Sequence, residues 1–208
     1  MRMKLFPRMI LAILFVCAAC SVLAQTAPAA REGGLPLTVG VGISDFDIDY
    51  GNDNGTERRM EGVSAWVDWN FYRAPSLLSG LGIEVEGRDI NLGRPASLEA
   101  FSSKLRESTA LGGVIYTVRH YRNFHPYAKY LMGIGSIDFP SSNPYYTHDT
   151  RTVYAPGAGV EYRVYRNVWL RGDYEYQFWP KLFGPNALTP SGFTIGASYD
   201  FGHHHGKK

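Results

Sequence analysis

Apolar and polar residues alternate along this chain with a period of two, and this pattern constrains its fold more than any other feature. The clearest stretch is 168–179, where Leu170 and Tyr174 alternate with Arg171 and Asp173. Side chains of a β-strand point alternately to opposite faces. This segment therefore predicts a strand with one apolar, aromatic face and one charged face.

Seven further segments alternate in the same way, two of them less cleanly. The predicted strands are 36–44, 62–71, 81–88, 109–119, 127–139, 152–165, 168–179 and 192–201. In the two weaker strands Leu111, Ile115 and Leu131 fall on the polar face. Short connections alternate with longer ones, which is typical of bacterial outer-membrane barrels. We therefore predict an all-β fold, an eight-stranded antiparallel up-and-down transmembrane β-barrel over residues 35–202, closed so that no strand edge is left unpaired.

Three features indicate that the apolar face points outward, toward lipid. Glycines concentrate on the polar face, where the narrow interior of an eight-stranded barrel needs small residues beside long ones. Aromatic side chains stand near strand ends on the apolar face, as they do at membrane interfaces. The polar face carries charges of both signs, which we expect to pair inside the lumen. The residues of this predicted lumen charge network are Glu84, Glu86, Arg88, Lys129, Glu161, Arg163, Arg171, Asp173 and Glu175. The alternative, a soluble periplasmic lipocalin-like ligand-binding barrel, would turn the apolar face inward.

The first 24 residues have the pattern of a secretory signal peptide. Basic residues precede an apolar run and then small residues, which predicts cleavage after Ala24. The run is shorter than the ~20 residues that a membrane-spanning helical anchor needs. Cys20 is a candidate lipidation site in a second interpretation. Residues 25–34 are expected to form a flexible lead-in.

Cleavage would change both the cysteine content and the charge. Cys17 and Cys20 lie before the cut, so the remaining chain would have no disulfide. Arg2, Lys4 and Arg8 would also leave, so the 21 basic residues fall to 18 against 19 acidic ones and the net charge falls from +2 to −1. This balance does not indicate a nucleic-acid partner.

The last predicted strand carries the most specific motif in the chain, Thr194-Ile-Gly-Ala-Ser-Tyr-Asp-Phe201. With it, the chain from about residue 35 to 201 resembles the small eight-stranded outer-membrane barrels of the OmpA-like type. The resemblance implies that Thr194, Gly196, Tyr199 and Phe201 form the signal read by the barrel-assembly machinery. It also implies a monomer located in the cell outer membrane. This chain continues beyond the final aromatic residue with a polar tail at 203–208.

Few residues suggest chemistry. His203–His205 could bind a metal, but we interpret them as a polar tail, and the acidic cluster that begins at Asp45 lacks the glycine that a calcium loop needs at its sixth position. His120, His125 and His148 have no nearby partners in sequence for nucleophilic catalysis. We therefore expect no enzyme and no cofactor. A barrel lipid A hydrolase or a narrow ion channel is the further alternative.

The loops suggest one partner. Arg58 and Arg59 lie beside the first predicted outer loop. Guanidinium groups bind phosphate well, and the outer leaflet is rich in phosphorylated lipopolysaccharide. We therefore expect a structural barrel with a side-chain-filled lumen, four outer loops for interaction, and possible lipopolysaccharide contact at these two arginines.

Overall fold

The computed structural model describes residues 36–48, 59–71, 78–92, 106–119, 123–138, 148–182 and 186–202. The predicted signal peptide, the lead-in, Arg58 and the tail histidines His203–His205 lie outside these residues. Within the described ranges no helix is long and apolar enough to cross a membrane.

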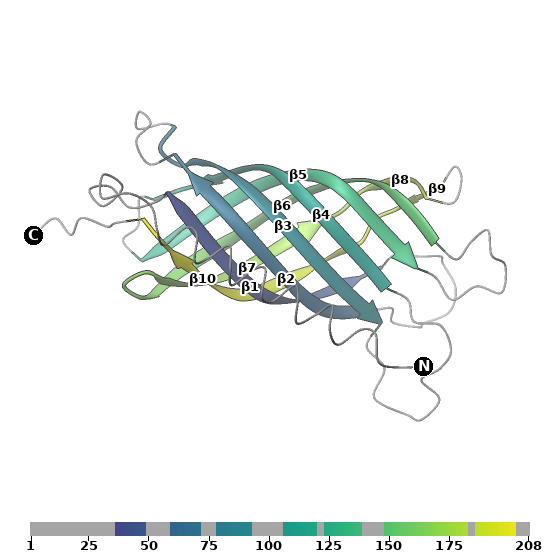
Figure 1. Ribbon diagram of the computed structural model, residues 1–208, viewed down its shortest axis with the longest axis horizontal. Helices are drawn as coiled ribbons and strands as arrows, with labels where there is room; N and C mark the ends of the chain where they lie inside the picture. The colour runs from purple at the N-terminus through teal and green to yellow at the C-terminus, as the bar shows by residue number, and fades with distance from the viewer. Residues whose placement is uncertain are drawn as a thin grey trace, which may run out of the picture. The chain divides into compact units, whose positions relative to one another are not determined.

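Eight strands close into a single barrel, in which every neighbouring pair is antiparallel (Figure 1). They are β1 (Leu37–Asp47), β2 (Arg59–Asn70), β3 (Leu81–Leu92), β4 (Arg106–Thr117), β5 (Phe124–Asp138), β6 (His148–Tyr165), β7 (Val168–Tyr176) and β10 (Ser191–Asp200). Their order around the barrel is β1-β10-β7-β6-β5-β4-β3-β2. The predicted eight-stranded antiparallel up-and-down fold is thus confirmed.

The strands differ from the predicted ranges mainly at one end of the barrel. There β1 continues to Asp47 and β6 begins at His148. Polar outward residues such as Asp45 interrupt the apolar alternation at this end, although the backbone pairing between strands continues through them. We call this the outer end, because the longer predicted loops begin here.

A short two-stranded sheet at the outer end was not predicted. It consists of β8 (Trp179–Leu182) and β9 (Asn186–Leu188), and it lies at the end of the barrel toward which β3 and β5 run (Figure 1). The single strand predicted over 168–179 is therefore wrong beyond Tyr176. The lumen–outside alternation of side chains nevertheless continues, since Gln177 and Trp179 are buried while Phe178 is exposed.

The two faces of the wall have opposite character. Outward apolar side chains are well exposed, as in Ile43 at 68% and Ile195 at 65%, whereas lumen-facing Glu84 is 0% exposed. A water-soluble barrel requires the reverse arrangement, because apolar burial is the main favourable term in its folding. The lipocalin-like alternative is therefore wrong.

The lumen contains an apolar core that the predicted charge network did not include. The core residues are Phe46, Ile48, Met60, Ile90, Leu111, Leu131, Ile137, Val153, Ala155, Trp179, Leu182 and Leu188. It extends from mid-strand Leu111 and Leu131 to the β8–β9 hairpin. Of the apolar residues that interrupted the polar face in the sequence, Leu111 and Leu131 belong to this core, and Ile115 is buried in the lumen outside it.

Candidate functional site

The charged side chains of the lumen come mainly from β3 and β7, which are opposite each other in the eight-membered ring of strands. Glu84, Glu86 and Arg88 alternate along β3, and Arg171 and Glu175 lie on β7. Residues two apart in a strand share a face, so each strand points a column of charges inward. Two salt bridges of 2.7 Å span the lumen: Arg88 to Glu175, and Arg171 to Glu84. Arg88 also pairs with Glu86.

Lys129 of β5 lies among four carboxylates. Its Nζ is 2.6 Å from Glu86, 3.0 Å from Glu175, and 3.3 Å from both Glu84 and Asp173. The ammonium group has only three protons to donate, so it joins acids of both β3 and β7 without satisfying all of them. Lys129 therefore links the two columns of charge.

Arg171 is held by both charge and aromatic contacts. Its Nε donates to the Tyr127 hydroxyl at 2.7 Å, and that hydroxyl donates to Asp173 at 2.8 Å. The guanidinium carbon lies 4.7 Å from the centre of the Trp66 ring and 4.6 Å from that of Tyr127. A cation over an aromatic face is stabilised by the ring quadrupole. These contacts fix Arg171 at the centre of the lumen.

Seven of the nine residues of the predicted network are joined by salt bridges in this cluster, whereas Glu161 lies next to the cluster and Arg163 lies apart from it. Arg163 donates to Asn123 at 2.9 Å near the inner end of the barrel and lies over Trp169. Glu161 stands opposite His125 and Arg171 in the strand register. Asp68, which the prediction omitted, joins the cluster through Arg171 at 3.5 Å. Its position on the polar face of β2 was the signal that could have found it.

Acidic groups outnumber basic ones in the part of the cluster that the structure describes. Five carboxylates, those of Asp68, Glu84, Glu86, Asp173 and Glu175, contact three cations, Arg88, Lys129 and Arg171. By formal charge the cluster therefore has two more acidic groups than basic ones. No group of three or more His, Cys, Asp or Glu side chains within the described ranges is placed to hold a metal ion.

The residues of the predicted assembly signal lie on β10 and just after it. Thr194 is buried in the lumen, with its hydroxyl 2.9 Å from that of Ser44. Gly196 stands beside Trp66, so closely that a Cβ at Gly196 would lie 2.6 Å from the indole. Tyr199 and Phe201 point outward with ring centres 4.8 Å apart. In the folded barrel the motif thus combines two lumen-facing positions with two lipid-facing aromatic ones.

Charged pairs line the outward face at the outer end. Arg59 donates two hydrogen bonds to Asp45, of 3.1 and 2.5 Å, and Arg106 is paired with Asp89 in the same way. Both arginine side chains are more than half exposed, at 59% and 53%. Exposed pairs of this kind contribute little to stability, so these arginines can exchange partners at little cost.

His148 has partners that the sequence did not predict. Its Nδ1 lies 2.6 Å from Asp138, and its Nε2 lies 3.3 Å from the Thr150 hydroxyl. These contacts give His148 polar neighbours, and the expectation that it takes no part in catalysis stays a prediction. The strand register places Asp138 of β5 opposite His148 of β6, and that pairing could not be read from spacing along the chain.

A closed antiparallel barrel with an apolar outer wall and a charged, filled interior defines a transmembrane β-barrel of the outer-membrane class. The sequence model of the protein family named outer membrane protein beta-barrel domain matches residues 15–201 of this chain. The chain belongs to this family, and its location is the cell outer membrane.

Solved structures of the same fold come from several bacteria. Neisserial surface protein A is 14% identical, with a TM-score of 0.60 over 80% of this chain and 97% of that one. The attachment invasion locus protein Ail of Yersinia pestis is 15% identical, with a TM-score of 0.56 over 79% of this chain and 97% of that one. Identities this low establish a shared fold only. None of the curated proteins matches the chain.

Proposed function

We propose that this outer-membrane barrel has a structural role, with a sealed lumen and an outer end that contacts lipopolysaccharide. The observation that supports the proposal is that side chains close the lumen at two levels. The salt bridges between β3 and β7 cross it, and the apolar core fills it toward the outer end. An eight-stranded barrel has an interior just wide enough for side chains, and here they occupy it.

Conductance in planar bilayers tests the seal, with membrane fractionation of the untagged protein as the companion measurement. We expect the protein in the outer-membrane fraction, heat-dependent mobility on a denaturing gel, and no steady pore conductance. A stable ohmic pore formed by the folded barrel would contradict the sealed lumen and favour the narrow ion channel. The acidic surplus of the cluster makes cation selectivity the expected property of such a channel.

The lipid contact is supported by the exposure of Arg59 at the outer end. Changing Arg58 and Arg59 to alanine should lower the lipopolysaccharide that copurifies with the barrel, because two guanidinium groups are lost. Arg166→Ala is the matched control, since Arg166 is an exposed arginine in the turn between β6 and β7, at the other end of the barrel. Equal lipopolysaccharide content in all three proteins would remove the proposal.

We also propose that the barrel functions as a monomer without catalysis, and that the assembly machinery reads its β10 motif.

One observation favours a second candidate function, a barrel lipid hydrolase. Asp138, His148 and Thr150 form a carboxylate–imidazole–hydroxyl series, which is the arrangement that activates a nucleophile. Release of fatty acid from lipid A by the wild type, and its loss in both His148→Asn and Thr150→Ala, would establish the hydrolase. Absence of release by the folded wild type would exclude it.

A further inference from the structure

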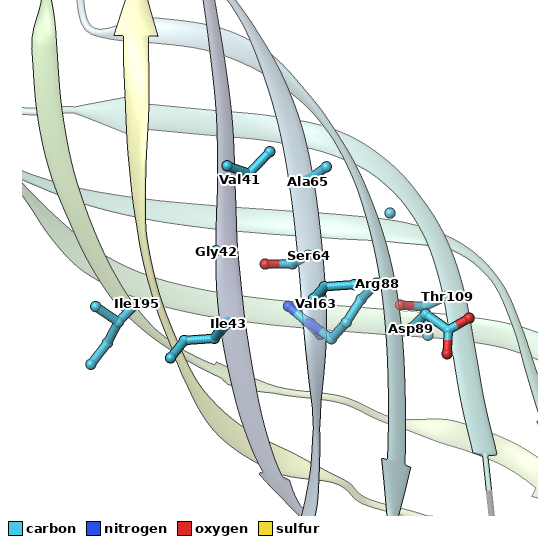
Figure 2. Close-up of a pocket in the computed structure, with 11 residues that line it drawn as sticks. Val41, Gly42, Ile43, Val63, Ser64, Ala65, Arg88, Asp89, Thr109 and Ile195 are labelled. Carbon is cyan, nitrogen blue, oxygen red and sulfur yellow. The ribbon is translucent and has the colours of Figure 1, made fainter. Parts of the chain in front are cut away.

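A groove of about 750 Å³ lies in the outward face of the wall where β1, β2 and β3 run side by side (Figure 2). Its apolar lining consists of Val41, Ile43, Val63, Ala65, Gly87 and Ile195. Its volume is within the ~300–1,000 Å³ typical of small-molecule sites. The groove therefore has room for part of an apolar ligand.

The strand register explains why the wall is hollowed here. Val41, Ala65, Gly87 and Ala110 are partners across four adjacent strands. Three of these four residues have the smallest side chains, and they lie next to the larger Ile43 and Val63. A Cβ built on Gly87 would have its nearest neighbour, the Thr109 carbonyl oxygen, at 4.0 Å. The hollow thus comes from absent side-chain volume.

The groove reaches charged side chains at its outer edge. Asp89 is part of its lining (Figure 2) and is paired with Arg106 of β4. On β1 and β2, Asp45 is paired with Arg59. Arginine can bind phosphate with two parallel hydrogen bonds, and carboxylates bind divalent cations. Alternating Arg and Asp side chains therefore complement a phosphorylated headgroup that carries its own divalent counterions.

We propose that this groove holds one acyl chain of a lipid A-type molecule of the outer leaflet, with a headgroup phosphate at Arg59 or Arg106. The inference rests on the proposed outer-membrane function. The groove is continuous with the wall that faces the bilayer, so hydrocarbon chains surround it. Its charged edge is at the outer end of the strands, where the phosphates of the outer leaflet lie.

Native mass spectrometry of the folded barrel in detergent tests the proposal, with lipid A and phosphatidylglycerol added in equal amounts. The decisive variant is Gly87→Leu, which fills the groove with a side chain. Ala128→Leu is the matched control, because Ala128 lies exposed on the outward face of β5, which is opposite β1 in the ring of strands and therefore away from the groove. Both substitutions add an apolar group to the lipid-facing surface without a clash in the lumen.

We expect the wild type and Ala128→Leu to retain lipid A in preference to phosphatidylglycerol. Gly87→Leu should lower lipid A retention about tenfold, which corresponds to roughly two methylene groups removed from contact. The double variant Arg59→Ala/Arg106→Ala should lose the preference for lipid A while retaining binding of either lipid through the groove.

Several results would overturn the proposal. Equal retention by Gly87→Leu and Ala128→Leu would mean that the groove does not hold the chain. Equal retention of both lipids by the wild type would exclude recognition of lipid A. A dimer that only Gly87→Leu abolishes would assign the groove to a second copy. Heat-dependent mobility and fractionation of each variant show independently whether the outer-membrane barrel itself is formed, so failure of the groove proposal can be distinguished from failure of the proposed function.

Discussion

The indole nitrogen of Trp179 donates a hydrogen bond of 2.8 Å to the side-chain oxygen of Gln177. The amide nitrogen of Gln177 in turn donates to Glu175 at 3.0 Å, and Glu175 pairs with Arg88 and Lys129. Trp179 also packs in the apolar core. These contacts connect the charge cluster of the lumen to its apolar core, so a substitution of Trp179 should affect both.

Trp179→Ala should lower the free energy of unfolding by about 3–5 kcal/mol, because it leaves a cavity where a fully buried aromatic side chain packs. Trp179→Phe should cost less, since it keeps most of the apolar volume and loses mainly one hydrogen bond. Urea unfolding in lipid vesicles measures both values. Phe178→Ala is the neighbouring outward-facing control, and a larger loss there than at Trp179 would show that the hairpin does not close the lumen.

Lys129→Met should destabilise the barrel by about 3–5 kcal/mol, because removing one partner of a buried ion pair leaves unpaired charge. Here four carboxylates would lose their shared cation. Lys181→Met, at an exposed lysine of β8, should leave stability nearly unchanged. Equilibrium unfolding of the two variants at one lipid composition makes the comparison. Similar stability in both would mean that the charge cluster is dispensable.

Gly40→Ala should be destabilising by about 1–3 kcal/mol, the usual cost of overpacking. A Cβ at Gly40 would lie 2.2 Å from the Trp66 ring, which is 2% exposed in the lumen. In the Trp66→Ala background the same change should cost less, because the ring is gone. Gly172→Ala is the control with open space. A double-mutant cycle measured by urea unfolding tests the coupling, and additive effects would contradict it.

Much of this fold could be predicted because each strand separates lipid from a polar interior. The alternation of Glu84, Glu86 and Arg88 with apolar neighbours identified both strand and face. The same reasoning could not show that Leu111 and Leu131 belong to a second, apolar layer of the lumen, because that layer is formed across strands that are distant in sequence.

The candidate sites were harder to predict for the same physical reason. Asp138 and His148 come together through register, and Gly87 becomes part of a groove only because Ala65 and Ala110 flank it on adjacent strands. The β8–β9 hairpin was missed because its strands are too short to show alternation. The alternation of side chains along one strand does not determine which residues of the neighbouring strand lie opposite them.

Glu107 provides the last prediction, since it is a buried acid outside the charge cluster. It is 1% exposed between its register partners Ile90 and Ile137, and neither carboxylate oxygen makes a hydrogen bond with the described protein atoms. A charge buried without a partner costs free energy that a neutral group does not. Glu107→Gln should therefore leave the free energy of unfolding unchanged or raise it by up to about 1 kcal/mol.

Glu175→Gln should lower the free energy of unfolding by a few kcal/mol, because Arg88 and Lys129 lose the negative charge of a carboxylate partner. Urea unfolding of the two variants in the same vesicles separates these roles, and a large loss of stability in Glu107→Gln would show that its carboxylate is a paired part of the lumen network.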